Sequence, residues 1–322
     1  MELQTKVNIS KSSFKINPTD KLLFVGSCFA ENIGRRFVEN QFDAIVNPYG
    51  TMYNPASVYH SVKRALEGVS GSLPTEGSPM LITSEYVQSG GRGRFDVAIF
   101  TLGTNHIYIL KETGEIVDNC MKRPQRLFRE EQLSVDECAD YLSKAVGLLK
   151  ERNPEVKVVF TVSPIRYAKY GFHGSQLSKA TLLLAVDKLV SASSGELCYF
   201  PAYEIMNDEL RDYRFYQPDM LHPSEQAVDY IYELFAETYF SADAKEMVRE
   251  WQPIKAALAH RPFNPDSEEH KAFLAKVSAR KDAFLAKWKC SINNYQLTSS
   301  SRIVLSSSLL RDGIWNGFTT DL

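Results

Sequence analysis

Short apolar segments, each followed by a turn residue, are the feature that most constrains the fold of this chain. Three of them predict buried strands: residues 22–25 before Gly26, residues 95–102 before Gly103, and residues 156–162 before Ser163. Helical patterns lie between them. Strands that alternate with helices join by right-handed crossovers, which makes the sheet parallel and puts helices on both faces. The sequence therefore predicts an α/β fold with a mainly parallel sheet.

The chain opens with a β-α-β unit. Its helix is predicted from apolar residues spaced about four apart: Phe29, Ile33, Phe37 and Phe42. The other elements follow in order: a strand at 44–46, helices at 135–150 and 178–190, and a short strand at 197–200. The α/β pattern thus extends over most of the first 200 residues.

Strand signals stop at about residue 240, which divides the chain into two parts. Residues 1–240 form the predicted α/β domain, and residues 241–322 form a helical extension with amphipathic patterns at 244–259 and 267–289. The serine-rich end, 291–322, is expected to be a poorly ordered tail. A stretch rich in Gly, Ser and Pro at 68–93 predicts a long surface loop.

Composition and charge exclude several classes of partner. The 322 residues carry a formal net charge of -2 and no basic run interleaved with aromatics, so no nucleic-acid partner is expected. Residues 1–20 lack the apolar stretch of a signal peptide, and no later segment is apolar enough to span a bilayer, so we expect a cytoplasmic protein without membrane contact. The five cysteines are scattered, which predicts reduced thiols.

Ser27 is the candidate nucleophile. Ligands of open α/β sheets bind outside the carboxyl ends of the strands, and Ser27, Gly103 and Ser163 all follow such ends. The Ser27 hydroxyl would stand near the amino end of the next helix, where N–H groups can bind an oxyanion. The alternative is a serine that only caps this helix. Cys28 beside it is expected to be a small buried residue instead of the nucleophile.

Asp219 and His222 are the candidate partners of Ser27. The histidine could take the serine proton, while the aspartate fixes its tautomer and stabilises the imidazolium. His222 precedes Pro223, which suits the first position of a helix. The alternative is an exposed helix entrance, where Asp and His are common.

Two turn segments offer donors for an oxyanion hole. Asn105 follows Gly103 directly after a predicted strand, so its carboxamide could reach the site, and Gly50 could supply a backbone N–H. Turn chemistry explains the same residues, because Gly and Asn are frequent in turns.

The loop at 163–174 combines cationic and aromatic side chains. Arg166, Lys169 and His173 could bind an anionic or sugar-like substrate, or they could simply pair with surface carboxylates. The spacing of His60, His106 and His173 matches no metal motif, so no metal site is expected.

The chain resembles the GSCFA family, which belongs to the SGNH (GDSL-like) hydrolase superfamily. The resemblance covers roughly residues 20–240 and is carried by a series of short motifs: residues 26–30, 47–51, 101–104, 119–120, 163–166, 213–216 and 219–223. It implies a three-layer, flavodoxin-like α/β/α fold. It also implies a triad of Ser27, Asp219 and His222, with the Ser27 N–H, the Gly50 N–H and the Asn105 side chain as oxyanion donors.

Two positions depart from the family pattern. The third sequence motif of the superfamily usually reads Gly-x-Asn-Asp, whereas His106 follows Asn105 here. Asn119 is therefore a competing candidate for the oxyanion donor. Family members often have a histidine after the Asn-Cys pair, where this chain has Met121. A role for that histidine is therefore absent from this chain.

Together these features predict a serine hydrolase that acts on a small acyl ester without a cofactor, with an O-acetylated carbohydrate as the leading substrate class. An O-acyltransferase with the same triad is one alternative. A catalytically silent glycan-binding protein is the other. The sequence does not indicate an oligomeric state.

Overall fold

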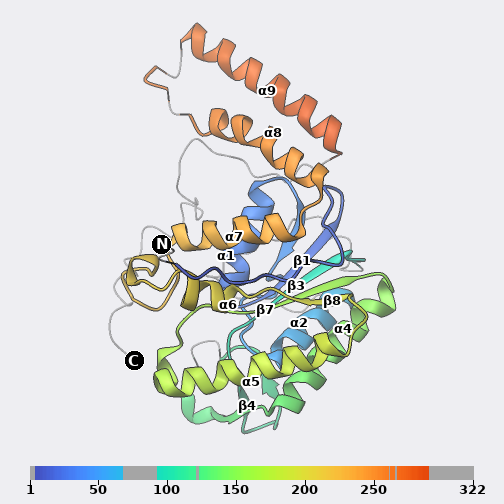
Figure 1. Ribbon diagram of the computed structural model, residues 1–322, viewed down its shortest axis with the longest axis vertical. Coiled ribbons are helices and arrows are strands. Elements are labelled where there is room, and N and C mark those ends of the chain that lie inside the picture. Colours follow the sequence, from blue (N-terminus) through green and yellow to red (C-terminus); the bar gives the residue numbers. More distant parts are fainter. Residues whose placement is uncertain (1–3, 68–92, 121–122, 261, 265–266, 290–322) are drawn as a thin grey trace.

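A parallel sheet with the strand order β2-β1-β3-β7-β8 forms the centre of the molecule (Figure 1). The computed structural model describes residues 4–67, 93–120, 123–260, 262–264 and 267–289. The sheet strands are β1 (Lys21–Gly26), β2 (Asp43–Val46), β3 (Val97–Leu102), β7 (Lys157–Val162) and β8 (Leu197–Tyr199). The predicted α/β fold with a mainly parallel sheet is therefore confirmed.

The sheet separates two hydrophobic cores. In β1, Leu22 and Phe24 belong to one core, whereas Leu23 and Val25 belong to the other. Successive side chains of a strand point to opposite faces, so a strand that is apolar throughout must be covered on both sides. This requirement explains why the central strands are continuous apolar runs.

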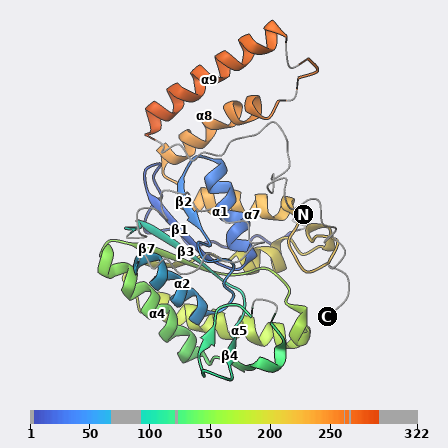
Figure 2. The ribbon, with the colours of Figure 1, turned by 180° about the vertical axis from the view of Figure 1, so that it is seen from behind.

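Helices cover both faces of the sheet. The first face carries α1 (Cys28–Glu39) and α7 (Glu225–Tyr239), and the second carries α2 (Pro55–Glu67), α4 (Val135–Arg152) and α5 (Gly171–Ser191) (Figures 1 and 2). On the first face, Phe37 of α1 packs against Phe24 of β1 and Phe235 of α7, with ring centroids 5.0 and 5.8 Å apart. The molecule is therefore a three-layer α/β/α sandwich.

Two features go beyond the sequence prediction. Helix α2 begins at Pro55, where the Oδ1 of Asn54 accepts the N–H of Ser57 at 2.9 Å and caps the helix. A second, antiparallel sheet joins β4 (His106–Leu110), β5 (Ile116–Val117) and β6 (Phe128–Gln132). Strand β6 is buried only at Phe128, so it lacks the apolar run on which strand prediction depends.

The remaining described elements are short turns of helix. They are α6 (Ala202–Glu204), a π-helical turn (Ile205–Glu209), and three 3-10 turns at Gln125–Leu127, Ala168–Tyr170 and Tyr213–Phe215. The predicted loop at 68–93 lies outside the described residues except for its last residue, and the predicted tail at 291–322 lies wholly outside them.

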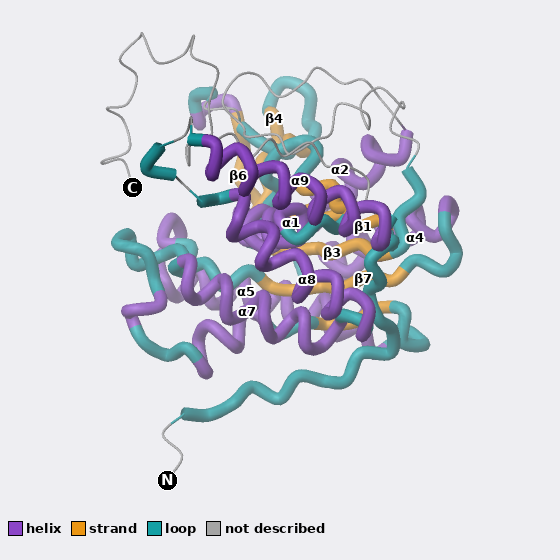
Figure 3. Tube along the Cα trace, turned by 90° about the horizontal axis from the view of Figure 1, so that it is seen from above, coloured by secondary structure: helices purple, strands orange, loops and turns teal. Residues whose placement is uncertain are grey.

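The C-terminal extension consists of α8 (Ala242–Leu258) and α9 (Glu268–Trp288), which lie side by side (Figure 3). Trp251 links α8 to α1 and to α9: its Nε1 donates to the Glu39 carbonyl at 2.7 Å, and its ring centroid lies 5.0 Å from that of Phe284. The extension therefore attaches to the carboxyl end of α1. None of the described helices has the length and apolar character that a membrane span needs.

The turn between β1 and α1 depends on Gly26. Its φ of +154° is unfavourable for other residues, and a Cβ atom built there would lie 2.2 Å from the carbonyl oxygen of Thr101. The absence of a side chain thus lets β1 and β3 approach each other directly before Ser27.

Replacing Gly26 with alanine should destabilise the protein by at least about 3 kcal/mol, because the new methyl group has to displace the backbone of β3. Gly147 of α4 is the matched control, since nothing lies within 4 Å of its added Cβ. Gly147→Ala should stabilise the helix by about 0.5–1 kcal/mol. Urea unfolding of both variants measures the difference. Equal stabilities would contradict the close contact.

Candidate active site

Ser27 occupies the turn from β1 into α1. It is the N-cap of the helix, its Oγ accepts the N–H of Phe29 at 3.3 Å, and the residue is only 1% exposed. This is the geometry of the capping alternative raised from the sequence. Accepting a hydrogen bond uses a lone pair, so the hydroxyl proton stays available to a base. Capping and nucleophilic attack are therefore compatible at this residue.

Asp219 and His222 form a closed turn. One carboxylate oxygen of Asp219, Oδ1, accepts the N–H groups of Leu221 at 2.8 Å and His222 at 3.0 Å. The other, Oδ2, lies 2.5 Å from Nδ1 of the His222 ring. The structure thus brings the two predicted partners together.

The charge of Asp219 is stabilised within this turn. Burial by itself would raise its pKa, but the N–H groups of His222 and Leu221 and the imidazole outweigh that effect and hold the pKa below its ordinary value. The carboxylate is therefore ionised at neutral pH and favours a proton on Nδ1 of His222. That tautomer leaves Nε2 as the basic nitrogen.

Arg166 supports the turn that carries His222. Its backbone N–H donates to the Leu221 carbonyl at 3.1 Å, and its Nη1 donates to the Met220 carbonyl at 3.2 Å. The guanidinium also lies 4.2 Å from the ring centroid of Phe172. The Arg166 contacts thus join the loop after β7 to the Asp219–His222 turn.

Arg36 ties the helix after Ser27 to the helix after His222. It is 7% exposed, its Nε donates to Asp229 Oδ1 at 2.6 Å, and its Nη2 donates to Glu225 Oε2 at 2.9 Å. Four residues further along α1, Asn40 donates to the Tyr232 hydroxyl at 2.9 Å. These contacts join the end of α1 to α7, the helix that follows the Asp219–His222 turn.

The Asp219–His222 turn is bonded to the loop after β7, because the Arg166 N–H donates to the Leu221 carbonyl and β7 ends at Val162, while Ser27 follows the last residue of β1. Ser27 and the Asp219–His222 turn therefore both stand at the carboxyl edge of the strands. Within the described part of the chain, no hydrogen bond joins Ser27 to His222. The three residues share an edge, and their cooperation as a triad stays a prediction.

The predicted oxyanion donors all have other partners in this structure. The Ser27 N–H donates to the Thr101 carbonyl at 3.0 Å, and the Gly50 N–H donates to the Asn47 carbonyl at 2.9 Å. The Asn105 Nδ2 donates to the Leu133 carbonyl at 2.7 Å, and Asn105 is 3% exposed. To bind an oxyanion, the backbone N–H groups of Ser27 and Gly50 would have to give up their present hydrogen bonds to carbonyl oxygens.

Asn47 is a functional candidate that the sequence analysis did not single out. Its Oδ1 accepts the Gly26 N–H at 2.9 Å, which fixes the orientation of the carboxamide. Its Nδ2 is a buried donor that has no partner in the described structure. Asn47 opens the motif at 47–51 from which only Gly50 was chosen, so the motif was the available signal.

Lys179 of α5 connects the segments that directly follow β3 and β7. It is 2% exposed, and its Nζ donates to the carbonyls of Gly103 at 2.7 Å and Ser163 at 2.8 Å. Burial lowers its pKa to about 7. Burial conversely raises the pKa of the nearby Cys28 thiol to about 11, so this thiol is not activated as a nucleophile.

The buried amine predicts a specific pH dependence of stability. The folded pKa of Lys179 is about 7, below the ordinary 10.5, so between these pH values the unfolded chain holds one more proton. The unfolding free energy of the wild type minus that of Lys179→Met should therefore be flat below pH 7. It should then rise with pH by at most about 1.4 kcal/mol per unit.

Denaturant unfolding of both proteins between about pH 6 and pH 9.5 measures this difference, and the window follows from the pKa of Lys179. Lys276→Met, an exposed lysine on α9, is the control and should give a flat profile. A flat profile for Lys179→Met as well would show that this amine keeps its ordinary pKa.

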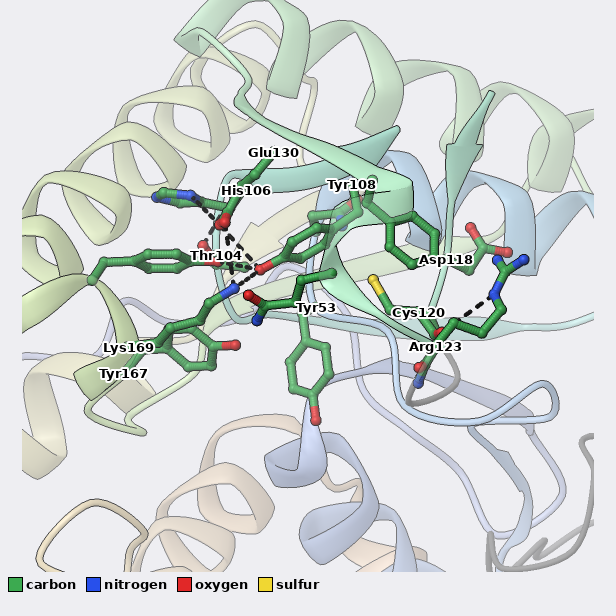
Figure 4. Close-up of a pocket in the computed structure, with 15 residues that line it drawn as sticks. Tyr53, Thr104, His106, Tyr108, Asp118, Cys120, Arg123, Glu130, Tyr167 and Lys169 are labelled. Atoms are coloured by element: carbon green, nitrogen blue, oxygen red, sulfur yellow. Dashed lines mark hydrogen bonds and ion pairs between the residues drawn. The ribbon is translucent and has the colours of Figure 1, made fainter. Parts of the chain in front are cut away.

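A cavity of about 440 Å³ lies between the antiparallel sheet and the loop after β7 (Figure 4). We call it the tyrosine pocket; its lining includes Tyr53, Tyr108, Tyr167, Tyr170, Glu130 and Lys169. Of the substrate-binding candidates from the sequence, Lys169 lines it and Arg166 and His173 do not. The competing donor Asn119 also lines it. The cavity itself could not be read from the sequence, because its walls come from four separate segments.

Two of the three histidines that were considered as metal ligands, His60 and His106, have carboxylate partners. His60 Nδ1 lies 2.8 Å from Asp118 Oδ1, and His106 Nδ1 lies 3.1 Å from Glu130 Oε1. Burial lowers the pKa of His106 despite the neighbouring carboxylate, so its ring is neutral at neutral pH. Among the residues that the structure describes, no group of His, Cys, Asp or Glu is arranged to hold a metal ion.

The fold and the site define a three-layer α/β/α protein with a serine at its first strand-to-helix turn and an Asp-His pair at the same edge of the sheet. Residues 21–74 and 91–235 match the model of the GSCFA family. Residues 251–291 match the C-terminal domain of GSCFA domain proteins, which the sequence analysis treated only as a helical extension. The chain belongs to the GSCFA family.

Several solved structures resemble the chain at low identity. A Streptococcus pneumonia protein with a proposed connection to platelet activating factor has a TM-score of 0.39 at 13% identity, over 67% of this chain and 84% of that one. A carbohydrate esterase family 3 protein from Talaromyces cellulolyticus has a TM-score of 0.33 at 12% identity, and the match covers 72% of this chain and 99% of that one. A family two carbohydrate esterase from Clostridium thermocellum, in complex with cellohexaose, has a TM-score of 0.32 at 11% identity. That match covers 69% of this chain and 64% of the esterase chain. These scores do not bear on the chemistry of the site. No curated protein matches the sequence.

Proposed function

We propose that the protein is a serine esterase of the SGNH type. The observation that carries the proposal is the 2.5 Å contact between Asp219 Oδ2 and His222 Nδ1, at the edge of the sheet where Ser27 follows β1. A catalytic triad needs a carboxylate that fixes the tautomer of its histidine, whereas a turn or a helix cap rarely needs one.

The proposed reaction proceeds through an acyl-enzyme. His222 Nε2 takes the hydroxyl proton as Ser27 Oγ attacks the ester carbonyl, and the protonated imidazole then gives this proton to the departing alcohol. Water, activated by the same nitrogen, releases the acid and restores Ser27. The ionised Asp219 stabilises the imidazolium at each stage. Side chains supply every step, so the proposal needs no cofactor.

Burial of Ser27 restricts the acyl group. With 1% of the residue exposed, an ester can reach Oγ only if its acyl part is small. An acetyl group on a carbohydrate is the substrate class that we propose. An O-acyltransferase would use the same acyl-enzyme and replace water with a second hydroxyl.

The burial and capping bond of Ser27 also favour a second candidate, a catalytically silent glycan-binding protein with the same fold. A fluorophosphonate probe separates the two, because only an activated serine reacts with it. Rapid labelling supports the esterase, and absence of labelling supports the binding protein.

Ser27→Ala should abolish both probe labelling and hydrolysis of nitrophenyl acetate, because it removes the attacking oxygen. The fold should persist, since the change empties almost no core volume; loss of the cap costs about 1 kcal/mol. Ser134→Ala removes the cap of α4 in the same way and is the control, which should keep full activity. Activity that survives in Ser27→Ala would overturn the serine mechanism.

The histidine should matter more than the aspartate, because only the histidine transfers a proton. His222→Ala and Asp219→Asn should each lower kcat by at least about a thousandfold, with the larger loss for His222→Ala. Asp208→Asn, at an exposed position, should leave kcat unchanged. If the two site variants keep wild-type rates, Asp219 and His222 serve only the turn before α7.

We also propose that the Asn47 carboxamide is an oxyanion donor, alongside the candidates Gly50, Asn105 and Asn119. Asn47→Asp keeps the oxygen that holds the Gly26 N–H but replaces the free amide donor. It should lower kcat roughly a hundredfold or more with little change in KM, because such a donor acts mainly in the transition state.

Asn105→Ala is the comparison, since its amide is already bound to the Leu133 carbonyl. Asn105→Ala should lower the free energy of unfolding, because it removes this buried hydrogen bond. Its kcat should fall less than that of Asn47→Asp. The reverse pattern in the two variants would return the side-chain role to Asn105, and a loss of kcat confined to Asn119→Ala would assign it to Asn119.

A further inference from the structure

The tyrosine pocket has the size and construction of a small-molecule site. Its volume of about 440 Å³ falls within the range of about 300–1,000 Å³ typical of ligand pockets. Figure 4 shows Glu130, His106, Tyr108 and Lys169 gathered on one side and Asp118, Cys120 and Arg123 on the other. The walls thus present both aromatic surface and fixed polar groups.

Hydrogen bonds hold the polar groups of the first side in place. Glu130 Oε1 accepts the Tyr108 hydroxyl at 3.0 Å, and Oε2 lies 3.4 Å from Lys169 Nζ. The Tyr108 hydroxyl lies 3.0 Å from that of Tyr170, whose ring stacks on His106 with centroids 3.5 Å apart. This network preorganises several donors and acceptors for hydroxyl groups.

Charges inside the pocket are matched in pairs. Glu130 is paired with Lys169, and Asp118 is paired with Arg64 and His60 from α2. Arg123 is exposed, and its guanidinium lies 4.9 Å from the ring centroid of Phe128. A ligand in the interior therefore meets no uncompensated charge, which favours an uncharged polar molecule over an anion.

The pocket adjoins the proposed catalytic edge. The Tyr53 carbonyl accepts the N–H groups of Gly103 at 2.8 Å and Thr104 at 2.9 Å. The preceding residue, Met52, donates to the Gly26 carbonyl at 2.8 Å, directly before Ser27. Tyr167 follows Arg166, which holds the turn of His222. One wall of the pocket is therefore built from the segments that position the catalytic candidates.

We propose that the tyrosine pocket binds an uncharged sugar ring, whose apolar face packs on tyrosine and whose hydroxyls bond to the Glu130 network. That this ring is the alcohol part of the substrate rests on the proposed esterase function. Binding of the ring does not, because none of the pocket residues named here is a proposed catalytic group.

Binding is tested without turnover, on the Ser27→Ala protein, with methyl glycosides of glucose, galactose, mannose, xylose and N-acetylglucosamine. Saturation-transfer NMR and titration calorimetry should show binding of at least one of them. Methyl glucuronide is the anionic arm, and it should bind no more tightly than the neutral glucoside. Failure of all the neutral glycosides, or a tenfold preference for the glucuronide, overturns the proposal.

Two variants locate the bound sugar. Glu130→Gln keeps the shape of the side chain but removes the charged acceptor, and it should raise Kd at least tenfold, as the loss of a charge-assisted hydrogen bond would. Tyr167→Ala should do the same by removing an aromatic wall. Phe263→Ala removes an exposed ring from the segment between α8 and α9, and should leave Kd unchanged. Unchanged Kd in both pocket variants would place the sugar elsewhere.

The two proposals fail separately. Fluorophosphonate labelling of the wild type tests the esterase, and glycoside binding to Ser27→Ala tests the pocket. Labelling without binding rejects the pocket alone. Binding without labelling rejects the esterase and leaves a glycan-binding protein.

Discussion

Three segments of the chain meet at the backbone of Gly26, and the site depends on this meeting. The Gly26 N–H bonds to the Asn47 side chain, its carbonyl accepts the Met52 N–H, and its Cα faces the Thr101 carbonyl where any side chain would collide. One glycine thus sets the relative positions of β1, β3 and the segment after β2. These contacts fix the backbone directly before Ser27, and the bond from the Ser27 N–H to the Thr101 carbonyl continues them.

Lys179 stabilises the other half of the same edge. A lysine is rarely buried, because its ammonium loses its hydration, yet here it satisfies two carbonyls that would otherwise lack donors where β3 and β7 end. The loops after these strands carry Asn105, Arg166 and Lys169. A polar group inside the second core therefore determines how loops from two different strands are spaced.

Much of the fold could be predicted because β1, β3 and β7 are buried on both faces and must be apolar throughout. Helix α2 also carried a usable signal, since Val58, Val62 and Leu66 recur at helical spacing after Pro55. The antiparallel sheet could not be found in this way, because β6 is mostly exposed and charged. The free amide of Asn47 and the tyrosine pocket depend on contacts between distant segments, which no local pattern encodes.

The attachment of the C-terminal helices has a consequence for the division of labour within the molecule. Trp251 holds α8 at Glu39, the last residue of the helix that Ser27 caps, so the length of α1, about 18 Å at 1.5 Å per residue, separates the two. Figure 1 likewise shows α8 and α9 at one pole and β4 at the other. The C-terminal helices therefore cover the end of α1 that is remote from Ser27 and leave the pole that carries β4 and the tyrosine pocket uncovered.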